Sequence, residues 1–413
     1  MSTTHEIVIL GANFAGVQTA HYLLKHTIPA LEKLIRKISY HITVVAPNTK
    51  TYYKIGAPRA IAAPSKISTS QLFLPIEQEF ANYDSRQITF IKGLATGICP
   101  SRAVNITTLE GHTRTIPYNT LIIATGSKFK SDLWNLTGDH TTSETAIQTL
   151  QQNLLQAKTI LIGGGGAVGV ETSSEIAENH PTAHITLLSG TTRVLPRLTE
   201  NTSKRTELKL AKLGINTVHN LKIHDSHRQP DGRTKIVFDN GTERTVDVYI
   251  DSTGGKPNTS FLPRAWLDIY GFVSVDESLR GNKAGMEDVY AIGDCASYSS
   301  CTNMDIYYSV APLASSIGVD LAPLLTKQKS PLPLTKQKFP LPLNKNKRRS
   351  TPLKQKSFQP IRDTLIVSVG SGGGIMQFMG WKVPSFVVWA VKSRDYMIGG
   401  AKKTVSGRRF GKA

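Results

Sequence analysis

The sequence contains few cysteines, fewer acidic than basic residues, and no long hydrophobic run. Its 413 residues include three cysteines, none of them in a CxxC pair, which excludes a disulfide framework and the zinc or dithiol chemistry of such pairs. No metal site is predicted. No apolar run reaches the roughly 18 to 20 residues that a membrane-spanning helix needs. The polar start reaches its first expected strand by Glu6, so we expect a cytoplasmic protein without a signal peptide.

Acidic residues are entirely missing between residues 323 and 360, where ten Lys and Arg residues occur. About half of the net charge of +19 therefore comes from this one segment, and the rest of the chain is only mildly basic. An imperfect nine-residue repeat rich in Pro and Lys predicts a disordered insertion here. Its only aromatic residues are Phe339 and Phe358, so nucleic-acid binding is not expected.

Two strand–glycine loop–helix patterns are the main signals that are present. The first is the apolar run 6–10 followed by the loop Gly11–Gly16, and the second is the run 159–162 followed by the loop Gly163–Gly169. In each case the helical pattern leads to another apolar run, at 41–45 and at 184–188. Strand, helix and parallel strand at this spacing predict two dinucleotide-binding βαβ units.

The two glycine loops differ in how completely they match the G-x-G-x-x-G pattern. The second loop has all three glycines, at Gly164, Gly166 and Gly169. In the first loop Asn13 occupies the middle position between Gly11 and Gly16. Because Asn tolerates a positive φ better than most residues, we expect the turn to survive and to open slightly. Such loops let backbone N–H groups and a helix N-terminus face a pyrophosphate.

Neither unit has the acidic residue that usually ends its second strand and binds a ribose hydroxyl. The first unit has Ala46-Pro47-Asn48 there, and the second has Ser189-Gly190-Thr191. A carboxylate would repel a 2′-phosphate, so Ser189, Thr191 and Arg193 could instead accept one and favour NADPH. The alternative is that Arg193 simply faces solvent.

The predicted fold class is α/β, with two Rossmann-like domains and a small α+β segment at the C-terminus. Apolar strands that end in Ala124-Thr-Gly126 and in Gly293-Asp294 indicate that the second domain interrupts the first. The predicted parts are a first dinucleotide-binding domain at 1–128 and 251–322, a second at 129–250, the insertion at 323–360, and the C-terminal interface segment at 361–413.

These motifs resemble the FAD-dependent pyridine nucleotide oxidoreductases with two dinucleotide-binding domains. The most similar branch is the apoptosis-inducing-factor-2 and ferroptosis-suppressor group with its fungal AMID-like relatives. The resemblance covers nearly all of the chain outside 323–360. It rests on Tyr52-Tyr53, Ala57-Pro-Arg-Ala60, Gly169-Val-Glu171, Arg193-Val-Leu-Pro-Arg197, Thr253–Leu262, Gly293-Asp294 and Lys392-Ser-Arg-Asp395.

The resemblance implies two cofactors, FAD in the first unit and NAD(P)H in the second. For FAD it implies a pyrophosphate site near Arg59, an adenine contact through the backbone of Ala95, and a ribityl or pyrophosphate contact of Asp294 at a helix start. The FAD loop itself comprises Gly11, Ala12, Asn13, Phe14, Ala15 and Gly16. The NAD(P)H site comprises Gly164, Gly166 and Gly169, with Ser189 and Arg193 near the adenosine.

Two residues are implied as catalytic. Glu171 matches a position beside the nicotinamide, and Lys392 matches a lysine near the flavin ring, where its charge would stabilise the anionic reduced ring. The alternatives are an exposed helix residue for Glu171 and a solvated helix face for Lys392. Likewise, Arg59 could form a surface ion pair, and Asp294 could be only a helix N-cap.

Residues 377–391 are apolar and aromatic, with basic residues on either side. This pattern fits either a packed interface segment or an anchor at an anionic membrane surface. We favour packing, because Pro384 suits a helix start and Val387, Val388 and Val391 would then share one core-facing side.

The predicted activity is hydride transfer from NAD(P)H to FAD, followed by electron transfer to a quinone-like or other small acceptor. Cys295 and Cys301 are unlike the redox dithiol of related reductases and are expected to be buried small hydrophobic residues. One alternative is a tailoring flavin oxidoreductase of a specialised-metabolite (polyketide) pathway. Another is a redox-sensing cell-death or binding flavoprotein. Peripheral contact with a membrane, at a mitochondrion or a lipid droplet, is left open.

Overall fold

A computed structural model describes residues 3–34, 38–322 and 354–410. Its largest sheet combines parallel strands with an antiparallel meander. The strand order is β18 (Val289–Ala291), β8 (Thr120–Ile123), β1 (Thr3–Leu10), β2 (Ile38–Ala46), β5 (Ile88–Cys99), β6 (Ala103–Thr108) and β7 (Thr113–Pro117). The two segments 3–123 and 289–291 therefore share one sheet, although the whole second sheet lies between them in sequence.

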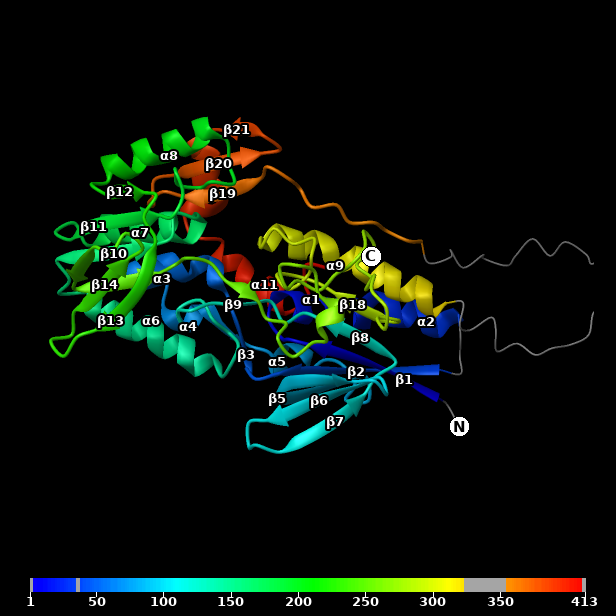
Figure 1. Cartoon of the computed structure of the whole chain (residues 1–413). Coiled ribbons are helices and arrows are strands. Elements are labelled where there is room, and N and C mark those ends of the chain that lie inside the picture. The colour runs from blue at the N-terminus through cyan, green and yellow to red at the C-terminus, as the bar shows by residue number, and fades with distance from the viewer. Residues whose placement is uncertain (1–2, 35–37, 323–353, 411–413) are drawn as a thin grey trace, which may run out of the picture.

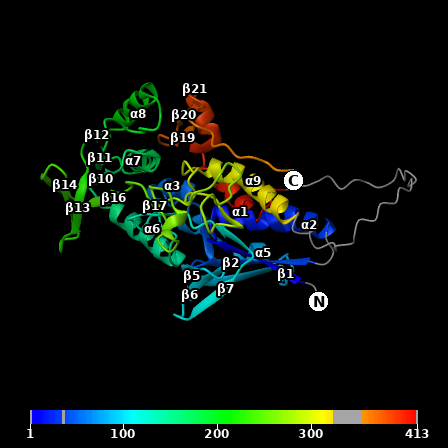
Figure 2. The ribbon, with the colours of Figure 1, turned by 45° about the vertical axis from the view of Figure 1, so that its right-hand side comes forward.

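The parallel strands of this first sheet are buried on both faces, as expected for a sheet covered on either side. Two helices, α1 (Phe14–Tyr22) and α9 (Asn303–Leu321), pack over one face (Figure 2). The helix α1 continues as a five-residue π-helical turn, η1 (Leu23–Thr27), and as α2 (Ile28–Leu34).

The second sheet is entirely parallel and lies in the other half of the molecule (Figure 1). Its order is β12 (Asn216–His219), β11 (His184–Ser189), β10 (Thr159–Gly163) and β16 (Val248–Asp251). The helices of this half are α6 (His140–Leu154), α7 (Ala167–Asn179) and α8 (Glu200–Lys212). The antiparallel sheet β13 (Ile223–Arg228), β14 (Thr234–Phe238) and β15 (Glu243–Val246) lies next to it. The predicted α/β class with two dinucleotide-binding units is confirmed.

Short elements join the two halves and complete the first. They are β3 (Lys50–Tyr52), η2 (Lys54–Gly56), α3 (Ala57–Ala62), α4 (Thr69–Leu72), β4 (Phe73–Pro75), α5 (Glu77–Phe80), β9 (Ser127–Lys128), β17 (Lys256–Pro257) and η3 (Arg264–Trp266). The strands β9 and β17 pair antiparallel where the chain passes between the halves.

The C-terminal segment packs on the second half and then returns to the first. An antiparallel sheet is followed by short helical turns that end against α1. Its elements are β19 (Leu365–Ser368), β20 (Gly374–Phe378), β21 (Trp381–Val383), α10 (Ser385–Val388), the π-helical turn η5 (Trp389–Ser393), η6 (Ile398–Gly400) and α11 (Ala401–Val405). The ring of buried His21 lies 2.7 Å from the carbonyl oxygen of Val405, and Lys25 donates to that of Gly407.

Residues 323–353 of the predicted insertion lie outside the described residues. The end of that range is packed: Phe358 is buried, and its backbone N–H donates to the carbonyl oxygen of Glu277. Packed chain therefore resumes before residue 360. Among the residues that the structure describes, no helix is both long and apolar enough to cross a membrane.

Candidate functional site

The first glycine of each loop has the same conformation and the same close contact. Gly11 has a φ of +106° and Gly164 a φ of +114°, a region that favours glycine. A Cβ on either residue would lie 2.4 Å from a backbone carbonyl oxygen, that of Ala124 or of Ser252. These oxygens belong to the small-residue turns that follow β8 and β16. In both units the first glycine of the loop therefore packs in the same way against the turn after a neighbouring strand, β8 or β16.

The third glycine of each loop lets a helix start close to the loop. A Cβ on Gly16 would lie 1.8 Å from the carbonyl oxygen of Gly11, and one on Gly169 would lie 1.9 Å from that of Gly164. Both positions exclude every other residue. The N-termini of α1 and α7 consequently sit directly behind loops without side chains, a cradle that fits the pyrophosphate of a dinucleotide.

At the middle position, Asn13 was expected to be tolerated because Asn can adopt a positive φ, and this reason is wrong. Asn13 has a φ of −105°, so it needs no left-handed conformation. Its side chain turns to the neighbouring segment instead, where its Oδ1 accepts from the N–H of Tyr52 at 3.2 Å. Gly166 also has a negative φ and precedes α7, and a Cβ there would meet nothing within 4 Å. The free space that a pyrophosphate needs is thus present in the second loop.

The other predicted FAD residues surround the first loop. Ala12, Phe14 and Ala15 are buried, and Ala15 lies against Gly293. Ala95 lies in β5 at an irregularity of the β5–β6 pairing between Ala95 and Gly97. Their contacts with FAD stay predictions.

Asp294 lies in a turn and not at the start of a helix, which corrects that expectation. The next helix, α9, begins only at Asn303 and has Thr302 as its N-cap. Burial raises the pKa of the Asp294 carboxyl, and the facing charge of Lys54 opposes this rise. The alternative that Asp294 is only a helix N-cap is therefore wrong in the part of the chain that the structure describes.

Lys54 is a residue of this site that the sequence reasoning missed. Burial lowers the pKa of its ammonium group to about 8, and Asp294 acts in the opposite direction. Its Nζ lies 4.9 Å from the centre of the Phe129 ring and 5.9 Å from that of Tyr52. The available signal was a lysine that directly follows Tyr52 and Tyr53, in a run 51–63 whose only other charged residue is Arg59.

The two predicted catalytic residues meet each other. The Nζ of Lys392 lies 2.5 Å from Oε1 of Glu171, and the N–H of Ser368 donates to the same oxygen at 3.0 Å. Both side chains are buried, so the exposed alternatives for Glu171 and Lys392 are wrong. Burial raises the pKa of Glu171, while the ammonium of Lys392 and the Ser368 N–H lower it. A carboxylate from α7 thus holds a cation of the C-terminal segment behind the second glycine loop.

A second buried ion pair lies one helical turn further along α7. Arg59 donates from Nη2 and Nε to the two carboxylate oxygens of Glu175 at 2.7 and 2.8 Å, and from Nη1 to the carbonyl oxygen of Arg394. The hydroxyl of Tyr396 also donates to Glu175. Arg59 forms an ion pair, as one alternative held, but it is buried and not at the surface. Its predicted place near the FAD pyrophosphate stays a prediction.

The residues expected near the adenosine of NAD(P)H lie together in the loop after β11. The hydroxyls of Ser189 and Thr191 both donate to the carbonyl oxygen of Arg193, at 2.7 and 2.9 Å. The guanidinium of Arg193 donates to the carbonyl oxygen of Pro196. No carboxylate stands at the end of β11 itself, but Glu200 and Glu207 line a cavity together with Arg193. The side chains of Ser189, Thr191 and Arg193 as placed bind the loop.

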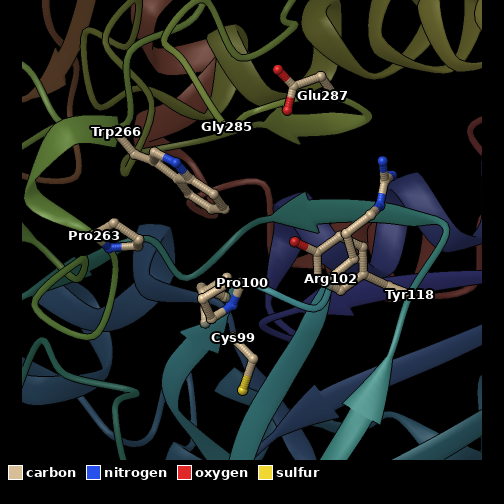
Figure 3. Close-up of a pocket in the computed structure, with 9 residues that line it drawn as sticks. Cys99, Pro100, Arg102, Tyr118, Pro263, Trp266, Gly285 and Glu287 are labelled. Atoms are coloured by element: carbon tan, nitrogen blue, oxygen red, sulfur yellow. The ribbon is translucent and has the colours of Figure 1, made fainter.

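The three cysteines are free and do not form a redox pair. Cys295 is buried as expected, whereas Cys301 is exposed, which corrects that prediction. Cys99 lines a separate cavity of about 350 Å³ between the β5–β6 connection and the loops around Trp266 and Glu287 (Figure 3). Its sulfur points away from the Trp266 ring and contacts Asn105. None of the predicted site residues lines this cavity.

Comparisons with known proteins agree with this arrangement. The family model for pyridine nucleotide-disulphide oxidoreductases matches residues 5–316. The oxidoreductase phnG of Penicillium herquei is 28% identical over 100% of this chain and 98% of its own length. Ferroptosis suppressor protein 1 of Homo sapiens is 25% identical over 97% of this chain and 95% of its own. The structure of NDH2 from Plasmodium falciparum, solved in complex with RYL-552, has a TM-score of 0.63 at 14% identity and covers 99% of both chains.

Proposed function

Because the chain belongs to the pyridine nucleotide-disulphide oxidoreductase family and is an NAD(P)H-dependent flavoprotein oxidoreductase, we propose that it reduces a quinone. The overall reaction is NAD(P)H plus a proton plus a quinone, giving NAD(P)⁺ and a quinol. The first glycine loop would hold FAD, which would supply the capacity to accept a hydride and to donate two electrons. The protein supplies the two cradles, the charge beside the reacting rings and the exclusion of water.

The buried pair of Glu171 and Lys392 is the observation that carries this proposal. The resemblance puts Glu171 beside the nicotinamide and Lys392 beside the flavin ring, and the structure joins them at 2.5 Å. Lys392 holds a positive charge where negative charge develops on ring reduction, a stabilisation that is stronger in a buried site than in water. Glu171 and the carbonyl oxygen of Ile366, 3.3 Å from Nζ, fix the position of that charge.

The small-molecule acceptor follows from the cysteines. Cys295 lies against the carbonyl oxygens of Ile123 and Ile292, and no second cysteine pairs with it. Electrons must therefore leave without a protein disulfide, directly to a small oxidant. We choose a quinone on the resemblance to the ferroptosis-suppressor group, and a long-tailed quinone implies contact with a membrane surface.

Anaerobic titration of the purified protein tests this proposal. We expect a yellow protein whose visible absorption is bleached by NADPH, by NADH or by both, and restored by added quinones. The ratio of the two apparent affinities tells whether Ser189, Thr191 and Arg193 accept the 2′-phosphate. A colourless protein that fails to bind added FAD, or bleached protein that no quinone reoxidises, contradicts it.

A tailoring oxidoreductase acting on one polyketide quinone is the second candidate. It is favoured by the match to the fungal oxidoreductase phnG over the whole chain. Reoxidation by a panel of simple benzoquinones and of fused-ring polyketide quinones separates the two. A preference of more than about tenfold for one fused-ring compound supports the second candidate. Fast bleaching with slow reoxidation by every acceptor would instead support a redox-sensing protein.

A further inference from the structure

The C-terminal segment exposes an unusual set of large apolar side chains. Trp381 is 79% exposed, Phe386 71% and Met379 63%. Within the described residues no other stretch of this length exposes as many. We name as the aromatic patch the residues Phe378, Met379, Trp381, Phe386, Trp389 and Val391. They belong to the β20–β21 hairpin, to α10 and to η5. The hairpin lies at the edge of the molecule beside α8 (Figure 1).

The hairpin presents its aromatic side chains at its tip. Phe378 and Trp381 are partners across the two-residue turn of Met379 and Gly380. Both turn residues have positive φ, +48° and +83°, as in the tight turns that match the twist of a hairpin. Gly380 suits this conformation, but Met379 does not, and the Met379 side chain stays mostly exposed.

The π-helical turn η5 explains why Trp389 and Val391 also face outward. The N–H of Arg394 donates to the carbonyl oxygen of Trp389, five residues earlier, so the turn contains one residue more than an α-helical turn. This rotates Val391 out to 47% exposure and brings Lys392 inside. The expectation that Val387, Val388 and Val391 share one buried side is therefore wrong for Val391.

The charges around the patch are predominantly positive. Residues 374–394 contain no acidic residue, and Lys382 is exposed within the hairpin. Lys209 of α8 lies 3.3 Å from the hydroxyl of Ser385, and the nearby charges of Arg205 and Lys212 help burial to lower its pKa. Asp363, whose carbonyl oxygen accepts from Gly380, follows the basic Arg362. Asp395 pairs with Arg394, and α8 also carries Glu200 and Glu207.

We propose that the aromatic patch docks onto the surface of an anionic lipid bilayer. Trp and Phe side chains prefer the boundary between headgroups and hydrocarbon, and basic residues beside them are attracted to anionic lipid. A second copy of the chain is the less suitable occupant, because a two-fold contact would place Lys382 and the cations of α8 against their own copies. Three of its residues, Phe378, Met379 and Trp381, stand at a hairpin tip, which suits shallow insertion.

This docking surface is adjacent to the proposed reaction site. Val391 belongs to the patch, and the next residue, Lys392, forms the buried pair with Glu171. If the quinone reductase proposal holds, a lipid-soluble acceptor would reach the site from the surface on which the protein docks. The docking itself does not depend on that proposal.

Tryptophan fluorescence with brominated lipid tests the docking. Of the four tryptophans, Trp134 and Trp266 are buried and Trp381 and Trp389 belong to the patch. On vesicles of phosphatidylcholine and phosphatidylserine with brominated acyl chains, we expect quenched, blue-shifted emission from the full-length protein. The double variant Trp381→Phe with Trp389→Phe should still bind in sedimentation but lose this quenching.

Vesicle sedimentation compares the patch with a matched apolar pair elsewhere. Trp381→Ser with Phe386→Ser should weaken binding by about tenfold or more, since each aromatic side chain contributes much apolar area. Ile269→Ser with Tyr270→Ser removes two side chains of similar exposure, 81% and 75%, and should leave binding unchanged. Lys382→Glu should weaken binding to anionic vesicles by about fivefold.

Equal vesicle binding by the Trp381→Ser/Phe386→Ser variant and by the Ile269→Ser/Tyr270→Ser variant overturns the proposal. Binding would then come from another part of the chain, such as the basic residues 323–360. A protein that ignores vesicles but runs as a dimer, which the patch variant converts to a monomer, overturns it in favour of a second copy. Turnover with a water-soluble quinone is measured on the same variants. Its absence in all of them contradicts the proposed function and leaves the docking result standing.

Discussion

The two glycine loops share one backbone frame but differ in what stands at its centre. Gly11 and Gly164 have φ values of +106° and +114°, and a Cβ on either would lie 2.4 Å from a backbone oxygen. Asn13 and Gly166 occupy the middle position with extended backbone in both units. The comparison shows that the first and third glycines determine the backbone conformation of the loop. The middle position is free to differ because the backbone there needs no special conformation.

The surroundings of the two loops differ more than the loops themselves. The first loop lies near two facing charged groups, Lys54 and Asp294, whose pKa values are both shifted by burial. The second loop is followed by α7, whose Glu171 and Glu175 pair with cations from outside the unit. The first unit therefore keeps charge next to its own site. The second uses charge to attach the C-terminal segment and α3.

The largest effects are expected from Gly11→Ala and Gly164→Ala. Each alanine would have a positive φ and a Cβ overlapping a backbone oxygen, at a cost of roughly 1–3 kcal/mol from each cause. Gly11→Ala should yield protein with little bound flavin. Gly164→Ala should keep its flavin but need far more NAD(P)H for bleaching. Flavin stoichiometry and anaerobic titration measure the two.

The contrast between these variants is itself the control. Two results would show that the two loops are not separate cofactor cradles. One is that both variants lose their flavin. The other is that Gly11→Ala keeps its full flavin content but no longer responds to NAD(P)H. Gly126→Ala has a positive φ but open space around its Cβ, and reports how much strain alone contributes.

The next largest effects are expected from breaking either of the two buried ion pairs of α7. Lys392→Met leaves Glu171 unpaired and Glu175→Gln leaves Arg59 unpaired, and each should lower the free energy of unfolding by about 3–5 kcal/mol. Only Lys392→Met should also slow flavin reduction, by about tenfold or more. Denaturant unfolding and stopped-flow bleaching separate the two effects.

Two further variants show whether a rate loss is electrostatic. Lys392→Arg should recover part of the rate because it restores the charge. The double variant Lys392→Met with Glu171→Gln should be more stable than Lys392→Met alone, since no buried carboxylate is left without its partner. If Glu175→Gln slows reduction as much as Lys392→Met does, the Lys392 charge has no special role.

The sequence alone predicted the two-unit fold and the position of both glycine loops in it. This was possible because strand, glycine loop and helix are local patterns, in which neighbouring residues carry the information. The pairing of Glu171 with Lys392 could not be predicted from them. These residues are 221 positions apart in the chain, and each was assigned separately by resemblance. The buried partner of Arg59 was missed for the same reason.

Other misses have local causes. The outward position of Val391 depends on one extra residue in the π-helical turn η5, which a 3.6-residue periodicity cannot reveal. The resemblance implied Asp294 at a helix start, but a turn intervenes before α9 begins at Asn303. Lys54 was overlooked because exposed lysines are common, and only the packing shows that this one is enclosed.

A smaller effect is expected when the middle residues of the loops are exchanged. Gly166→Asn introduces a side chain into open space and should raise the KM for NAD(P)H by about tenfold without changing stability. Asn13→Gly removes the contact with Tyr52 and should cost about 1 kcal/mol of stability while flavin content stays the same. If Gly166→Asn leaves the KM unchanged, the space in front of α7 is not where the cofactor binds.

The last comparison is the pH dependence of stability due to Lys54, in the first unit. Its pKa is about 8 in the folded protein against an ordinary value of 10.5. Between these pH values the unfolded chain binds more protons, so Lys54 makes the free energy of unfolding rise with pH, and below pH 8 its buried charge is a constant penalty. Lys54→Met should therefore raise Tm most below pH 8, with the gain shrinking towards pH 10. As a control, Lys128→Met, at an exposed lysine, should show no such trend. Parallel curves of Tm against pH for Lys54→Met and the unaltered protein would mean that Lys54 is solvated. The charge asymmetry between the two units would then be absent.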